Sequence, residues 1–168
     1  MMKNLTLTVL IVLLGILYAC KPTVEQAIKY NDDIISKNDS IAVKLGLLTD
    51  AYDKMIPEQM DKAYDEALKS TKAGIEFLNK LEPFDKDTSF KAGALNLFKT
   101  YQSVLENEHK RLIELSKLPE SKYGDNEVAE YAKLRDQANS KTDQEINKLT
   151  EIQEKFSKKF KFDITEDK

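Results

Sequence analysis

The chain contains one histidine, His109, which follows Glu106 at a spacing that could bind a metal. Di-iron helical bundles use Glu-x-x-His to place a carboxylate and an imidazole on one inward helix face. Such a site needs a second Glu-x-x-His, and the sequence has no second histidine. At about 100° per residue, Glu106 lies about 200° around a helix from the apolar Val104. We therefore expect the Glu106 carboxylate to face solvent, and we predict no metal site.

Two other chemistries would also depend on His109. A b-type haem could take His109 with Met55 or Met60 as axial ligands, but the sequence has no haem-attachment motif. A Ser-His-Asp triad lacks the strained Gly-x-Ser-x-Gly turn, and no glycine-rich phosphate loop is present. Gly74 and Gly93 fall inside predicted helices, where close helix approach or a tolerated surface position explains them. We expect no catalytic residue and no cofactor, and therefore a protein that is not an enzyme.

The single cysteine, Cys20, ends a stretch with the features of an export signal. Lys3 supplies a short positive start, and residues 5–18 are uncharged and rich in leucine. This segment is shorter than the roughly 20 apolar residues needed to cross a bilayer. Residues 17–20, Leu-Tyr-Ala-Cys, resemble the lipobox of lipoprotein signal peptides. The resemblance implies a signal peptide over residues 1–19, cleavage before Cys20, and covalent diacylglycerol and N-acyl lipid on Cys20.

The composition of the remaining chain, residues 20–168, indicates one domain that carries its own core. Without Lys3 it has 25 basic and 29 acidic side chains, a net charge of −4, which argues against nucleic-acid binding. Charged residues of both signs make up 33% of the whole chain and indicate a water-exposed surface. No intrachain disulfide can form with one cysteine, and the length suffices for one ordinary domain. No segment after Cys20 is apolar enough to span a membrane.

Prolines divide the chain after Cys20 into four segments rich in helix-forming residues, because proline disfavours helix interiors. The predicted helices cover about 23–55, 57–82, 87–118 and 125–161. Short connections make neighbouring helices pack antiparallel. The sequence therefore predicts an all-α fold, an antiparallel up-down-up-down four-helix bundle, in which the last helix ends beside the lipid anchor.

Apolar residues recur at three- and four-residue steps in each segment, as expected for helices with one buried face. The predicted core positions are Val24, Ile28, Ile35, Ala42, Leu45, Leu48, Tyr52 and Met55; Met60, Tyr64, Ala67, Thr71, Ile75, Leu78 and Leu81; Phe90, Ala94, Leu97, Phe98, Tyr101, Val104, Leu105, Leu112, Leu115 and Leu118; and Val128, Tyr131, Leu134, Ala138, Ile146, Leu149, Ile152, Phe156 and Phe160. Asp87 and Asp125 are predicted N-caps. Gly46 could end the first helix early.

Four polar residues fall on or beside these predicted core faces: Asn31, Asn38, Tyr101 and Glu108. Buried polar groups need hydrogen-bond partners. One interpretation is that the four pair with each other or with water and fix the helix register, as a buried Asn does in a coiled coil. The alternative is a polar core pocket that binds a ligand or a cation.

The C-terminal segment contains a locally basic, aromatic stretch with Lys155, Lys158, Lys159 and Lys161. Lysines suit the C-terminal end of a helix, where the macrodipole is negative. The predicted bundle also places them beside Cys20, where each could contribute about 1 kcal/mol with anionic headgroups. The sequence therefore offers a secondary membrane contact at this end as a hypothesis.

The mature chain resembles a functionally uncharacterised family of helical surface lipoproteins from spirochaetes and Bacteroidota-type bacteria. The resemblance is carried by residues 30–32 (Tyr-Asn-Asp), Pro83-Phe84, Asp87, Phe90-Lys91, Leu97-Phe98, Tyr101 and Asn107-Glu108. His109 departs from it, because an aromatic residue is expected there. The resemblance implies a lipid-anchored bundle in the envelope and brings no known activity or catalytic residue.

These observations predict a non-enzymatic lipoprotein of the bacterial cell envelope with a structural or protein-interaction role. Its expected partners are the membrane, through Cys20, and an envelope protein. Lys21 is not the aspartate that marks inner-membrane retention in enterobacteria-like sorting, so we expect the outer membrane, on its periplasmic face or at the cell surface. The alternative is a ligand- or metal-binding bundle that uses the polar core pocket.

Overall fold

The computed structural model describes residues 22–54 and 56–164, and this part of the chain is helical with no β-strand. The long helices are α2 (Val24–Lys54), α3 (Pro57–Lys80) and α6 (Asp125–Phe160). The remaining long helix consists of α4 (Ser89–Val104), a π-helical segment (Leu105–His109) and α5 (Lys110–Ser116), which follow one another without a break. A short 3₁₀ turn, Glu120–Lys122, precedes α6. The prediction of an all-helical chain with four helices is confirmed.

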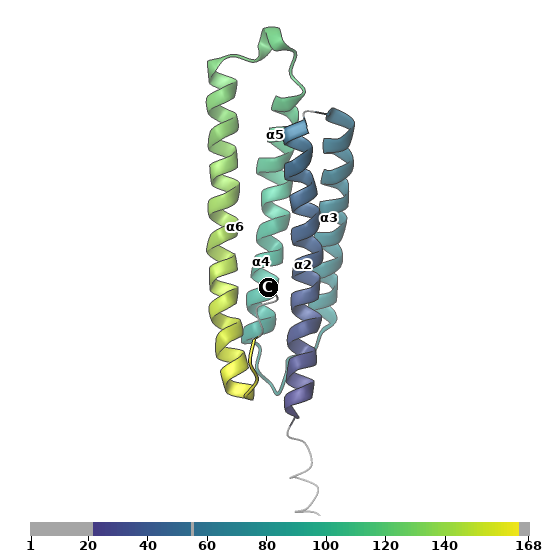
Figure 1. Ribbon diagram of the computed structural model, residues 1–168, viewed down its shortest axis with the longest axis vertical. Helices are drawn as coiled ribbons and strands as arrows, with labels where there is room; N and C mark the ends of the chain where they lie inside the picture. The colour runs from purple at the N-terminus through teal and green to yellow at the C-terminus, as the bar shows by residue number, and fades with distance from the viewer. Residues whose placement is uncertain (1–21, 55, 165–168) are drawn as a thin grey trace, which may run out of the picture.

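The four long helices lie side by side in an elongated molecule (Figure 1). Helix α3 packs against both α2 and α4, and α4 also packs against α6, whereas α2 and α6 touch over a smaller area. The start of α2 and the end of α6 lie at the same end of the molecule (Figure 1). The ring of Tyr30 there lies 5.7 Å from that of Phe156. None of the described helices combines the length and the apolar composition needed to cross a bilayer.

Two apolar clusters form the core along the axis of the molecule. The cluster near the start of α2 is rich in aromatic rings and includes Tyr30, Phe90, Phe98 and Phe156. The cluster near the end of α2 includes Leu48, Tyr52, Met60, Leu105 and Leu112. Leu45 packs against both clusters and connects them.

The predicted core face of the first helix is partly wrong. The fully buried apolar residues of α2 include Ala27, Ile34, Ile41 and Leu48, which recur every seven residues. Val24 and Ile28 are 40% and 39% exposed, and Ala42 is also exposed. The exposed residues lie in a neighbouring stripe, on the side of α2 where Asn31 forms a hydrogen bond with Gln153 of α6. Periodicity alone does not distinguish two adjacent stripes.

The predicted core positions of the second and third segments are buried or half-buried throughout. In the fourth segment Val128 and Ile146 are exposed, at 52% and 38%. Helix α6 buries few residues, which are Ala138, Leu149, Phe156 and Ser157. A helix that contacts its neighbours along a narrow strip leaves part of its apolar stripe in solvent, so the prediction was too broad there.

The predicted helix ends need two corrections. Asp87 is not the N-cap of α4, because the helix begins at Ser89 and the residue before it is Thr88. The Asp87 carboxylate still accepts hydrogen bonds from the backbone N–H of Ser89 (2.9 Å) and from its hydroxyl (2.5 Å). Asp125 is not an N-cap, because it is the first residue inside α6. The residue before the helix is Gly124, whose N–H donates to the Glu127 carboxylate at 3.0 Å. The first helix does not break at Gly46 but continues to Lys54.

Candidate functional site

The predicted lipidation site, Cys20, lies outside the described residues, as do the signal segment 1–19, Lys21 and Met55. The first described residue is Pro22, and α2 begins two residues later. The Thr23 side chain accepts from the Gln26 N–H (3.3 Å), and the Gln26 side chain accepts from the Thr23 N–H (2.9 Å). This reciprocal capping box defines where α2 starts. The helical body therefore begins within a few residues of Cys20.

The four predicted polar core residues do not gather in one pocket. The Tyr101 hydroxyl donates to Asn38 Oδ1 at 3.2 Å, which joins α4 to α2. Asn31 pairs elsewhere, because its Oδ1 accepts from Gln153 Nε2 at 2.8 Å and joins α2 to α6. Each pair satisfies a polar group at a different level of the molecule and favours one register between two helices.

Glu108 belongs to the π-helical segment and is buried, with a side chain that is 8% exposed. Its Oε1 accepts from Lys141 Nζ at 2.6 Å, whereas its Oε2 has no hydrogen-bond partner among the described residues. Lys141 lies on α6 and its side chain is 51% exposed. A buried carboxylate with one lysine partner and one unpaired oxygen destabilises the fold, because burial removes the charged group from water. π-helical turns are often found at functional sites, which makes Glu108 the best polar candidate in the core.

His109 packs against Tyr52, with the two rings nearly parallel and their centroids 5.8 Å apart. The Tyr52 oxygen lies 2.8 Å from His109 Nδ1. Burial lowers the pKa of His109 to about 4, so the imidazole is neutral at pH 7. Burial also raises the pKa of Tyr52. The pair is a neutral, hydrogen-bonded unit of the core rather than an acid–base pair exposed to a substrate.

The Glu106 side chain faces solvent, as the helical geometry predicted. It is exposed, and its carboxylate accepts from Gln102 Nε2 at 2.9 Å and lies 3.9 Å from Lys72 Nζ. Within residues 22–54 and 56–164, no three histidine, cysteine, aspartate or glutamate side chains converge as metal ligands. Met60, one of the residues considered as a haem ligand, is fully buried in the core cluster with Tyr52.

A small cavity lies between α2, α4 and α6. Its volume is about 110 Å³. The polar side chains around it are Thr49, Tyr101, His109, Asn139, Thr142 and Asp143. An engineered 150 Å³ cavity holds one benzene molecule, so this space suits a few waters or a very small polar molecule. Tyr101 is thus the predicted pocket residue that borders a cavity, and it does so with His109 rather than with Asn31 or Glu108.

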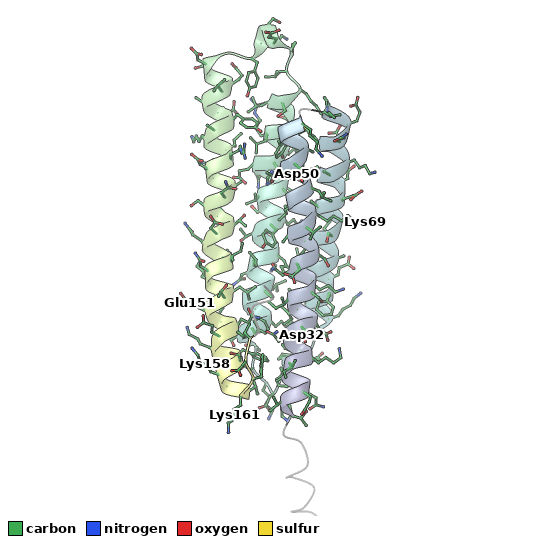
Figure 2. The ribbon with its side chains drawn as sticks, viewed as in Figure 1. Asp32, Asp50, Lys69, Glu151, Lys158 and Lys161 are labelled. Atoms are coloured by element: carbon green, nitrogen blue, oxygen red, sulfur yellow. The ribbon has the colours of Figure 1, made fainter. Side chains whose placement is uncertain are left out.

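The four predicted membrane-contact lysines differ in their partners. Lys159 donates to Asp87 at 2.6 Å, and this contact, with the Ser89 hydrogen bonds, lowers the pKa of Asp87 to about 2. Lys158 lies 3.5 Å from Glu154. Lys155 and Lys161 have no ion-pair partner in the described part of the chain. Lys158 and Lys161 lie at the end of the molecule where α2 begins (Figure 2).

Some of the residues that carry the family resemblance, Tyr30, Phe84, Asp87 and Phe90, meet at this same end. Phe84 packs edge-on against Phe160, with centroids 4.9 Å apart, and lies 5.3 Å from Tyr30. A turn after Phe84 holds it there, since the Asp87 N–H donates to the Phe84 carbonyl at 2.8 Å. The two residues between them, Asp85 and Lys86, have positive φ values of 48° and 64°. Left-handed conformations are unusual for residues other than glycine and carry strain of order 1 kcal/mol or more.

The pairing of Tyr101 with Asn38 agrees with the interpretation that the polar core residues pair with each other, whereas the sequence did not indicate the partners of Asn31, Glu108 and His109. Tyr52 was assigned to the apolar face of the first helix, and neither Lys141 nor Gln153 was singled out. These partners lie 33 to 122 residues away along the chain, so no local pattern identifies them. Comparisons with protein-family models, with curated proteins and with solved structures found no match to this chain.

Proposed function

We propose that this protein is a lipid-anchored lipoprotein of the bacterial cell envelope, without enzymatic activity, whose helical body serves protein contacts or structural support. The observation that carries the proposal is the stretch from Lys3 to Cys20: a positive start, an uncharged leucine-rich segment, and Leu-Tyr-Ala-Cys at its end. Cleavage before Cys20 would leave the lipid four residues before the start of α2. The resemblance to the helical surface-lipoprotein family supports the same proposal.

The finer architecture belongs to this proposal. We propose an antiparallel up-down-up-down four-helix bundle that follows a cleaved signal peptide over residues 1–19. The short connections between helices and the shared location of the start of α2 and the end of α6 support it (Figure 1). In this arrangement the anchor and the C-terminal lysines are at one end, and the turn before α6 is at the other. The body would extend away from the membrane as a rod.

The proposed location is the outer membrane, on its periplasmic face or at the cell surface, and the proposed partner is an envelope protein. The identity of residue 21, a lysine, supports this destination rather than the inner membrane. Protease treatment of intact cells tests the orientation, because a surface-exposed body is degraded and a periplasmic one is protected. Digestion only after the cells are permeabilised contradicts exposure at the cell surface.

The lipid anchor can be tested in the host with a labelled fatty acid. The unaltered chain should incorporate label and fractionate with membranes. Cys20→Ala should lose both properties, and no other cysteine in the sequence could take its place. Ser70→Ala, a change in α3 far from the anchor, is the matched control and should behave as the unaltered chain. Equal labelling of the Cys20→Ala protein contradicts the proposal.

A ligand-binding bundle is the second candidate, and the cavity beside Tyr101 and His109 is the observation that favours it. A thermal-shift screen of the purified protein with divalent metals and small polar molecules tests this function. A ligand that raises the melting temperature of the unaltered protein and not that of Tyr101→Phe would support it; no shift with any compound contradicts it.

A further inference from the structure

Helix α6 is attached to the rest of the molecule unevenly along its length. Three of its four buried residues lie within 149–160, whereas the longer first part, 125–148, buries only Ala138. In the last turns the ring of Phe156 packs in the aromatic cluster, with its centroid 5.0 Å from that of Phe90. Burial of apolar surface is the main favourable contribution to folding. The end of α6 is therefore held firmly, and the first part is held weakly.

Several of the contacts that hold residues 125–148 lie at the surface. Tyr131 and Leu134 pack against the cluster near the end of α2, but both are only half-buried. Arg111 of α5 donates two hydrogen bonds to the Glu130 carboxylate, at 2.8 and 3.1 Å. Their side chains are 44% and 41% exposed, and ion pairs exposed to water contribute little to stability. These contacts therefore oppose separation of the first part of α6 only weakly.

The contact between Lys141 and Glu108 differs from these, because it involves a buried charge. The Glu108 carboxylate belongs to the π-helical segment, which packs against α6, and only one of its oxygens has a partner among the described residues. Separation of residues 125–148 from the core would let water reach both oxygens and remove the cost of burying the charge. Hydration of Glu108 therefore favours an open state, whereas its ion pair with Lys141 favours the closed one.

The same part of α6 forms one wall of the cavity beside Tyr101 and His109. All the residues that α6 contributes to the lining lie within 125–148: Ala138, Asn139, Thr142 and Asp143. Because α2 and α6 touch over a small area, α2 supports this wall little. We propose that residues 125–148 form a lid that opens over the cavity while residues 149–160 stay packed. The opening gives water and small polar molecules access to Tyr101 and His109. It requires no ligand, so it does not depend on the proposed ligand-binding function.

Hydrogen–deuterium exchange of the unaltered protein, followed by mass spectrometry, tests the lid. A separated helix of this length is marginal in water, so its amides exchange whenever the lid opens. After correction for intrinsic rates, we expect amides in 130–145 to exchange together and roughly tenfold or more faster than those in 150–158. Equal exchange in the two ranges overturns the lid. A rate that falls gradually from the start of α6 indicates fraying of the helix end and overturns it as well.

Two substitutions test the contact that holds the lid closed. Lys141→Ala should speed exchange in the lid roughly tenfold, because it leaves the buried Glu108 charge without its partner. Lys148→Ala is the matched control and should change nothing, since Lys148 pairs with Glu145 on the same helix. Glu108→Leu should slow exchange about fivefold, because the closed state then buries no charge. Equal effects of Lys141→Ala and Lys148→Ala, or faster exchange in Glu108→Leu, overturn the role of this contact.

Discussion

Replacing two glycines by alanine should shift stability in opposite directions. Gly46 is exposed on α2, and a Cβ atom there would meet nothing within 4 Å. Alanine is favoured over glycine in a helix by about 1 kcal/mol, so we expect Gly46→Ala to stabilise the fold by about that amount. Gly74 is buried in α3, and its added Cβ would lie 2.9 Å from Ile41 Cδ1 and 3.0 Å from two ring atoms of Phe98.

Carbon atoms in ordinary contact are about 3.5–4.0 Å apart, so Gly74→Ala forces Ile41 or Phe98 to move. Both side chains are fully buried. Overpacking of this kind costs about 1–3 kcal/mol. The gain of about 1 kcal/mol in helix propensity on replacing glycine by alanine offsets part of this cost, so we expect a net loss of stability of up to about 2 kcal/mol. The structure explains Gly74 as a point of close helix approach, one of the two interpretations that the sequence allowed.

Thermal denaturation of the protein, followed by circular dichroism, measures both effects. For a chain of this size, 1 kcal/mol corresponds to about 2–4 °C in melting temperature. We expect Gly46→Ala to melt higher than the unaltered protein and Gly74→Ala to melt lower. Equal stabilisation by both substitutions would refute the reasoning, since it would mean that α2, α3 and α4 do not approach closely around Gly74.

Three further outcomes are expected. The single histidine signal in a proton NMR titration should move with a midpoint near 4, because burial favours the neutral form of His109. The contribution of neutral His109 to the stability of the fold is then fully present above the ordinary pKa of 6.5 and is lost as the pH drops from 6.5 to 4. A midpoint near 6.5 contradicts the buried site. Glu108→Leu should be neutral or stabilising by about 1 kcal/mol, whereas Lys141→Ala should destabilise by about 1–3 kcal/mol, because only the second change leaves a buried charge without a partner; denaturation midpoints in the reverse order contradict this. Lys86→Gly should stabilise by about 0.5–1 kcal/mol in the same assay, since glycine adopts its φ of 64° without strain, and a loss of stability would be evidence against the left-handed turn.

The helical character of the chain was predictable because it depends on local features. Proline positions and helix-forming composition predicted four helices, and the apolar spacing predicted the buried faces of α3 and α4. The first helix carries two apolar stripes with the same period, through Val24 and Ile28 and through Ala27 and Ile34. The choice between them depends on how closely α6 packs, which is a property of the whole fold.

The polar core residues show a similar limit. Their position on a buried face indicated that Asn31, Asn38, Tyr101 and Glu108 need partners, and each has one. Which residue pairs with which depends on the relative levels of separate helices. The sequence therefore predicted the need for partners, whereas the pairing through Gln153 and Lys141 required the structure.

The most direct test of the proposed function is the intact mass of the protein extracted from membranes of its native host. We predict a chain that begins at Cys20 and is heavier than residues 20–168 by a diacylglyceryl group and one acyl chain, with no free thiol. A mass equal to that of the full chain, with residues 1–19 still attached and the Cys20 sulfhydryl unmodified, would contradict the account.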